Sequence, residues 1–184
     1  MKAITTKNGY TLTIEQDQDI TDSPRDWDNL GKMVCFHRRY NLGDKHDFKT
    51  PEDAKDFLRG GELGSEVAVS LPLFLLDHSG LSMSTGDFGD PWDSGQVGFI
   101  YATWDDVKKE YGDTSPESLQ RAKEVLQGEV ETYDQYLRGD VYYYKIEDED
   151  GEIVESCGGY YGEEYAKNDG MRSLNALAKK KVKK

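Results

Sequence analysis

The chain has 184 residues, with 23 Lys and Arg against 36 Asp and Glu, and a net charge of −13. This length predicts one domain with its own hydrophobic core, and the acidity argues against a general DNA-binding surface or a peripheral membrane protein. Two cysteines are too few for a disulfide scaffold. No apolar run approaches the roughly 20 residues of a membrane span, and the first residues lack the apolar stretch of a signal peptide. We therefore expect a cytoplasmic protein.

The first 103 residues read as strands joined by polar loops, with one short helix. Apolar and polar side chains alternate in the expected strands, which gives each a buried face. Thr50 before Pro51 marks the helix start, because Thr caps a helix and Pro suits its first turn. In chain order we expect a strand over 10–15, a loop over 17–29, a strand over 32–38, a helix over 51–59, a strand over 66–77, a Gly-rich loop over 79–95 and a strand over 96–103.

The second part of the chain predicts more helix. In the longest helix, apolar side chains recur at steps of three and four, as expected for one face packed on a core; they are Leu119, Ala122, Leu126, Val130, Tyr133 and Leu137. In chain order we expect a short helix over 104–110, the long helix over 115–138, a hairpin of strands over 141–147 and 152–160, and a last helix over 163–184.

Together these elements predict an α+β fold. We expect a mainly antiparallel, curved sheet of about five or six strands, packed by the long helix and by two or three shorter helices. We assign residues 1–178 to this single domain and residues 179–184 to a basic tail.

The acidic residues are concentrated in the second part of the chain. Residues 104–165 carry 18 acidic and 6 basic side chains, whereas residues 166–184 carry 1 and 7. Three glutamates spaced seven apart share the helix face opposite the apolar stripe, and the hairpin turn adds aspartates. This pattern fits either a solvated face that keeps the protein soluble or a surface that imitates the phosphate backbone. For the second case we predict one exposed face made of Glu117, Glu124, Glu131, Asp148 and Asp150.

The loops at 22–29 and 77–96 have an unusual composition. Both are rich in Asp and hold a Trp, which offers a flat stacking surface to a ligand, and the second is also rich in Gly and Ser, which allow a close approach of its backbone. The plainer interpretation is that the Trp side chains fill the core while Asp side chains cap turns. If the loops form a ligand-binding site, we expect it to bring together Trp27, His37, His78, Asp87, Trp92 and Asp93.

Other chemistry is weakly supported. The turn at 148–152 resembles part of an EF-hand loop but has Ile146 and Cys157 where the end ligands belong. The three histidines form no tight pair of the zinc-binding kind, so the pattern leaves metal binding undecided. Cys35 lies two residues before His37, as a nucleophile and base might be placed on one side of a strand, but a buried free thiol is the better interpretation.

Several segments resemble a known family. They are Asp22-Ser23-Pro24-Arg25-Asp26-Trp27-Asp28-Asn29, the stretch from Met33 to Asp44, the stretch from Leu71 through Asp77-His78-Ser79-Gly80, Pro91-Trp92-Asp93-Ser94-Gly95-Gln96-Val97-Gly98 and the stretch from Tyr133 to Tyr142. They are similar to small acidic, biochemically uncharacterised proteins encoded by bacteriophages and mobile elements, over most of residues 10–165. The resemblance supplies no catalytic residues. It implies a genomic setting in which small acidic proteins often inhibit host defence.

These observations predict an accessory protein that inhibits a nucleic-acid-acting defence system, of the anti-CRISPR or anti-restriction type, through its acidic surface. The expected partner is a nuclease or CRISPR effector in the cytoplasm of a bacterial host. We expect a binding protein without a cofactor rather than an enzyme, and direct contact with nucleic acid only through the basic tail. The alternative is a small ligand- or metal-binding domain, or a hydrolase, that uses the loops at 22–29 and 77–96.

Overall fold

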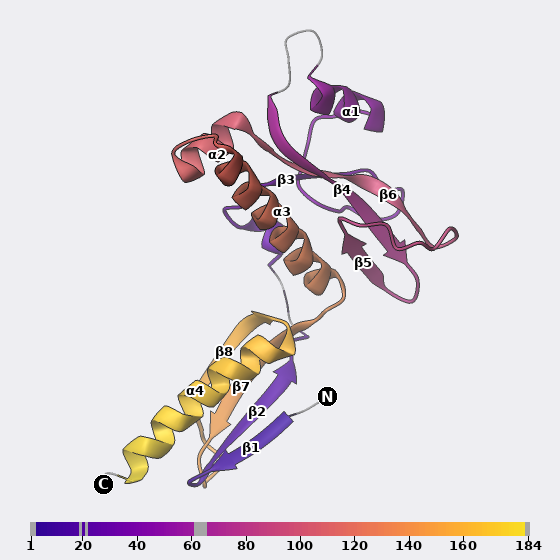
Figure 1. Cartoon of the computed structure of the whole chain (residues 1–184). Coiled ribbons are helices and arrows are strands. Elements are labelled where there is room, and N and C mark those ends of the chain that lie inside the picture. Colours follow the sequence, from indigo (N-terminus) through magenta and orange to yellow (C-terminus); the bar gives the residue numbers. More distant parts are fainter. Residues whose placement is uncertain (1–2, 19, 21, 61–65, 183–184) are drawn as a thin grey trace. The chain divides into compact units, whose positions relative to one another are not determined.

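The computed structural model describes residues 3–18, 20, 22–60 and 66–182. Its contacts divide the chain into two compact units. The central unit is Ser23–Leu137, and the terminal unit combines Met1–Asp22 with Arg138–Lys184. We expected one domain, but each unit has a sheet, a long helix and a core of its own, and each is described by itself (Figure 1).

The central unit is built on one antiparallel sheet with the strand order β3-β6-β4-β5. Pro72 lies in β4 before the part that pairs with β5, which is where a residue without an amide hydrogen is tolerated. In chain order the elements are η1 (Pro24–Asp26), β3 (Lys32–Cys35), α1 (Pro51–Arg59), β4 (Val67–Asp77), β5 (Leu81–Ser84), β6 (Ser94–Thr103), α2 (Trp104–Tyr111) and α3 (Pro116–Leu137).

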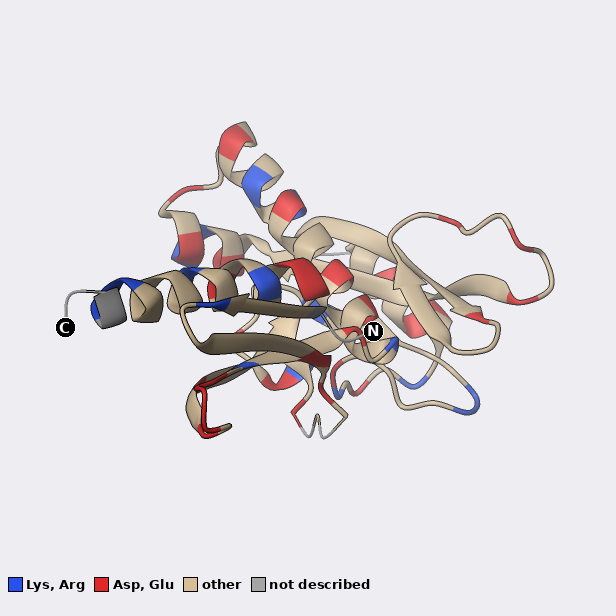
Figure 2. Cartoon of the chain, turned by 90° about the horizontal axis from the view of Figure 1, so that it is seen from below, with Lys and Arg blue, Asp and Glu red and all other residues tan. Residues whose placement is uncertain are grey.

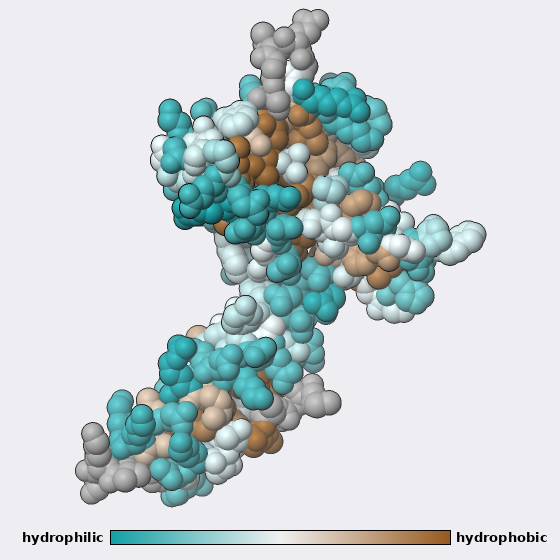
Figure 3. All heavy atoms as spheres, viewed as in Figure 1, coloured by the Kyte–Doolittle hydropathy of each residue, from teal (hydrophilic) through white to brown (hydrophobic). Residues whose placement is uncertain are grey.

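The long helix α3 forms the main core of the central unit. Its residues Leu126, Val130 and Tyr133 are buried against the sheet, which confirms the apolar stripe. In Figure 3, apolar atoms lie between α3 and the neighbouring strands, whereas the outer side of α2 and α3 is hydrophilic. A second cluster includes Ala54 of α1 and Phe99 of β6, so α1 has its own core contacts.

The terminal unit pairs the two ends of the chain in a sheet with the order β1-β2-β7-β8. Helix α4 covers this sheet and buries Leu12, Ile14 and Leu174. Gly170 lies where a Cβ atom would come within 2.8 Å of Leu12, so this glycine allows the close approach of helix and sheet. The elements are β1 (Ala3–Lys7), β2 (Tyr10–Gln16), β7 (Val141–Glu147), β8 (Ile153–Tyr161) and α4 (Glu163–Val182).

The α+β class and the antiparallel pairing are confirmed, but the strands form two four-stranded sheets instead of one sheet of five or six. The reason is that α3 and α4 each bury the apolar face of a different sheet. Two short strands were not expected: β1 has few apolar residues, and β5 lies in the stretch 79–95 that was assigned to a loop because of its glycines. Lys179–Val182, assigned to a basic tail, continue α4, and residues 183–184 lie outside the described residues.

Replacing Leu126 by Ala tests the core of the central unit. Because the side chain is fully buried, we expect the free energy of unfolding to fall by about 2–5 kcal/mol. All three Trp residues belong to this unit, so denaturant unfolding followed by Trp fluorescence measures it. The exposed Lys123→Ala on the same helix should change stability by at most about 0.5 kcal/mol. Equal effects of the two substitutions would contradict the packing of α3.

Candidate functional site

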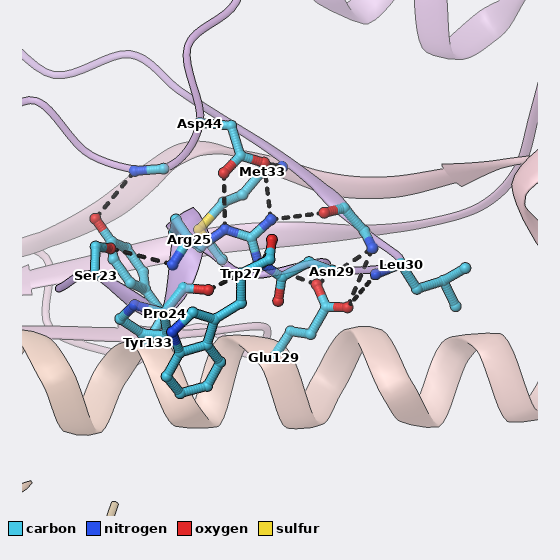
Figure 4. Close-up of polar contacts among 12 residues, drawn as sticks. Ser23, Pro24, Arg25, Trp27, Asn29, Leu30, Met33, Asp44, Glu129 and Tyr133 are labelled. Carbon is cyan, nitrogen blue, oxygen red and sulfur yellow. Dashed lines mark hydrogen bonds and ion pairs between the residues drawn. The ribbon is translucent and has the colours of Figure 1, made fainter. Parts of the chain in front are cut away.

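A buried arginine joins the first loop of the central unit to β3 and α3 (Figure 4). The guanidinium of Arg25, whose side chain is 5% exposed, forms a two-pronged pair with Asp44, at 2.9 Å from Nε and 2.8 Å from Nη2. Its Nη1 donates to Glu129 of α3 at 3.0 Å. Nη2 also donates to the carbonyl of Gly31 at 2.6 Å.

The two carboxylates are also bound by backbone amides. Glu129 accepts hydrogen bonds from the amides of Leu30 and Gly31, and Asp44 accepts one from Met33 at 2.7 Å. Burial by itself lowers the pKa of the Arg25 guanidinium, but the pairs with Asp44 and Glu129 more than offset this and raise the pKa above its ordinary value. The arginine is therefore a charged structural link that two carboxylates share.

Trp27 belongs to this structural cluster. It is 52% exposed, so it does not fill the core, and its amide donates to the carbonyl of Pro24 in η1. Figure 4 draws its indole beside Pro24. The loop that sequence analysis singled out for its Trp is thus organised by Arg25, whose role was not predicted. An arginine in a loop carries no signal that distinguishes a buried pair from an exposed charge.

Three of the six predicted ligand-binding residues line one hollow in the central unit. This pocket has a volume of about 280 Å³, and His37, Trp92 and Asp93 are part of its wall. His78 is tied to it through a contact of 2.6 Å between its Nδ1 and the carboxylate of Asp93. Asp77, also in the wall, forms an ion pair with Arg39. The structure therefore brings together His37, His78, Trp92 and Asp93, whereas neither Trp27 nor Asp87 lines the pocket.

The loop between β5 and β6 presents Trp92 to solvent. Its side chain is 91% exposed, while its backbone is held by a hydrogen bond of 2.8 Å to the carboxylate of Asp90. The same carboxylate accepts the amide of Asp93 at 3.0 Å, and these two backbone bonds lower the pKa of Asp90. Asp87 accepts the amide of Gly89 in the same loop. A Trp on a hydrogen-bonded loop, outside any core, is typical of a contact residue.

The His78–Asp93 pair resembles part of a catalytic triad, since a carboxylate on one ring nitrogen orients the imidazole. A nucleophile would have to lie at the other nitrogen, Nε2. Within the described ranges, Nε2 of His78 has no hydroxyl or thiol partner. The other candidate nucleophile is also unsuited, because burial raises the pKa of the Cys35 thiol to about 12.

The acids of α3 divide into two groups. Glu129 and Asp134 point inward, the second accepting hydrogen bonds from Ser82 and from the amide of Met83. Glu117, Glu124 and Glu131 are exposed, as predicted for them. Two exposed cations of the same helix, Arg121 and Lys123, lie between the first two of these along the chain, and Arg121 stacks on Tyr111 at 4.6 Å.

The two acids of the hairpin turn belong to the terminal unit. The carboxylate of Asp148 accepts the amides of Asp150 and Glu152 at 3.0 Å each, so it shapes the turn between β7 and β8. Asp150 is exposed. The predicted face therefore draws on both units: the helix acids belong to the central unit and the hairpin acids to the terminal unit.

The acid excess lies mainly in the central unit. By sequence it carries 22 acidic and 12 basic residues, a net charge of −10, against 14 and 11, a net of −3, in the terminal unit. Figure 2 shows acidic residues spread over helices and loops, and basic residues along α4 toward the C-terminus.

Comparison of the chain with family models, with curated proteins and with solved structures found no match. In the described part of the chain, no group of three or more His, Cys, Asp and Glu residues could hold a metal ion. None of its helices has the length and apolar character needed to cross a membrane.

Replacing Arg25 by Met should strongly destabilise the central unit. The change leaves Asp44 and Glu129 without their cation in a partly buried site, which typically costs about 3–5 kcal/mol. The matched control is Arg39→Met, because the Arg39–Asp77 pair involves an arginine side chain that is 67% exposed, and such pairs contribute about 0–1 kcal/mol. Denaturant unfolding of both variants measures the difference. If Arg25→Met costs no more than Arg39→Met, the buried pair does not stabilise the fold.

Proposed function

We propose that this protein is a non-enzymatic inhibitor of a host defence system that acts on nucleic acid. In this proposal, exposed acids of the central unit occupy a basic surface on a restriction nuclease or CRISPR effector. The observation that carries it is the row of Glu117, Glu124 and Glu131 on the solvent side of α3, in a unit with a net charge of −10.

The helix is suited to present these charges. Residues seven apart on an α-helix lie about 10.5 Å from one another along its axis. The opposite side of α3 is fixed in the core by Leu126 and Val130, and Glu129 is tied to Arg25. The three exposed carboxylates are thus held on a rigid element, which limits the entropy lost when a partner binds.

Two features of the described residues support binding rather than catalysis. The thiol of Cys35 is buried and has a raised pKa, and the His78–Asp93 pair has no nucleophile beside it. The resemblance of the sequence to proteins of bacteriophages and mobile elements supports the choice of a defence system as target. Such an inhibitor acts in the cytoplasm of the bacterial host. It needs no cofactor, and it contacts the partner protein instead of nucleic acid.

Charge reversal on α3 tests the proposal. We expect the tagged full chain to capture nucleic-acid-binding proteins from a bacterial lysate, with added DNA and rising salt reducing the capture because binding is electrostatic. The variant Glu117→Lys/Glu124→Lys/Glu131→Lys should lose this capture while remaining folded, since each exposed charge contributes only about 0–1 kcal/mol to stability. Captured proteins are identified by mass spectrometry.

The control for this experiment is Asp28→Lys/Glu52→Lys/Asp56→Lys, which changes the net charge equally at exposed acids outside α3. It should keep the partner. If both variants fail to capture the partner, the capture depends on the net charge of the protein and not on the acids of α3. If the α3 variant still captures the same proteins, the acidic helix only keeps the protein soluble.

A second candidate function is ligand or protein binding at the pocket beside Trp92. It is favoured by the observation that four predicted residues meet there, with Trp92 91% exposed. The same capture experiment with Trp92→Ala separates the two candidates. Loss of the partner in this variant, together with its retention in the α3 variant, would assign the interaction to the loop between β5 and β6.

A further inference from the structure

A second hollow of the central unit lies along the loop that follows β3. It has a volume of about 730 Å³ and is lined by residues 35–38 and 40–46, a size usual for small-molecule sites. Its wall is held in place by backbone bonds, because the amide of Gly43 donates to the Tyr133 hydroxyl at 3.1 Å and that of Asp44 donates to the Met33 carbonyl at 2.8 Å. We call this hollow the β3 groove. It is preformed, since Asp44 is also fixed by Arg25.

The charge of the β3 groove is opposite to that of its unit. Among the residues that line the groove, Arg38 and Lys45 are basic and Asp44 is acidic, whereas the unit as a whole has a net charge of −10. The carboxylate of Asp44 is paired with Arg25, which it shares with Glu129. Arg38 and Lys45 line the groove and are exposed, and within the described residues neither has a hydrogen bond or ion pair. At physiological salt, charges act over about 8 Å, so these two exposed cations can attract an anion that enters the groove.

Histidines add hydrogen-bonding groups to the same wall. Nδ1 of His37 accepts the amides of Arg39 and Tyr40 at 3.3 Å, which leaves Nε2 as the N–H donor of the neutral ring. His46 uses Nε2 on the carbonyl of Cys35 at 3.2 Å, and its Nδ1 is buried without a partner among the described residues. Unpartnered buried polar atoms are rare in proteins and are commonly satisfied by water or a ligand.

The remaining wall is apolar. Phe36, Tyr40 and Leu42 line the β3 groove beside the cations. The ring of His37 stacks on Tyr40, with centroids 5.0 Å apart and planes at 10°, so part of the wall is flat. A purely inorganic anion would use the cations and leave these surfaces unused. A ligand with an anionic end and a less polar, planar part would use both.

We propose that the β3 groove binds an organic phosphate, with Arg38 and Lys45 pairing with the phosphate and the aromatic side chains contacting the organic part. This site is separate from the acids of α3, and the proposal does not depend on the proposed function. Arginine and lysine are both common phosphate partners in proteins.

Isothermal titration of the full chain tests this proposal with three probes: ADP, inorganic pyrophosphate and adenosine. We expect ADP to bind at least tenfold more tightly than either of the others, because only ADP has both the anionic and the planar part. Arg38→Ala/Lys45→Ala should weaken ADP binding at least tenfold. The matched control, Lys108→Ala/Lys109→Ala, removes two exposed cations of α2 and should leave the affinity within twofold.

Three results would overturn the proposal. The first is the absence of measurable ADP binding by the folded protein. The second is equal affinity for ADP and pyrophosphate, which would mean that the apolar wall makes no contribution. The third is an equal loss in the two double variants, which would mean that the effect comes from net charge. Circular dichroism of each variant establishes that it is folded before titration.

Discussion

Burying a guanidinium costs free energy unless opposite charges pair with it. In the central unit, the carboxylates of Asp44 and Glu129 form these pairs with Arg25. These residues are far apart in the chain, so the pairing joins the loop before β3, the loop after β3 and the long helix α3. The backbone amides of Leu30, Gly31 and Met33 complete the hydrogen bonding of the two acids. Gly31 fits here because a Cβ atom at this position would meet Leu126 at 2.3 Å.

The contacts of α3 with its neighbours separate its inner acids from its exposed ones. Glu129 is held by Arg25, and Asp134 is held by Ser82 and Met83, so both are occupied in binding α3 to its neighbours. The acids spaced seven apart point away from these contacts and stay exposed. The helix therefore separates its charges by function: the inner acids position it, and the outer acids are available to a partner. A count of acidic residues along α3 does not make this distinction.

The loops at 22–29 and 77–96 both contain Trp and several Asp residues, but their structures differ. In the first, Arg25 and Asn29 hold the chain together through internal bonds, and Trp27 lies beside Pro24. In the second, Asp90 fixes the backbone around Trp92 while the indole extends into solvent. The difference is that the first loop contains a cation that α3 and the loop after β3 can bind. The second has no such link and is held by its own aspartates, which leaves its Trp exposed.

The sequence by itself determined most elements of both units, since apolar periodicity and local caps are short-range signals. Thr50 and Asp53 form the capping box that begins α1, and Leu126 lies at the centre of the predicted stripe of α3. The sequence could not determine that β2 pairs with β7 across 125 or more residues, or that the strands form two sheets. Pairing of distant strands depends on which apolar faces find a helix to cover them. The composition of the second loop did predict that His78 and Asp93 share a site, and the structure brings them to 2.6 Å. The burial of Arg25 was decided only by the tertiary structure, because side chains far apart in sequence carry no local sign of their contact.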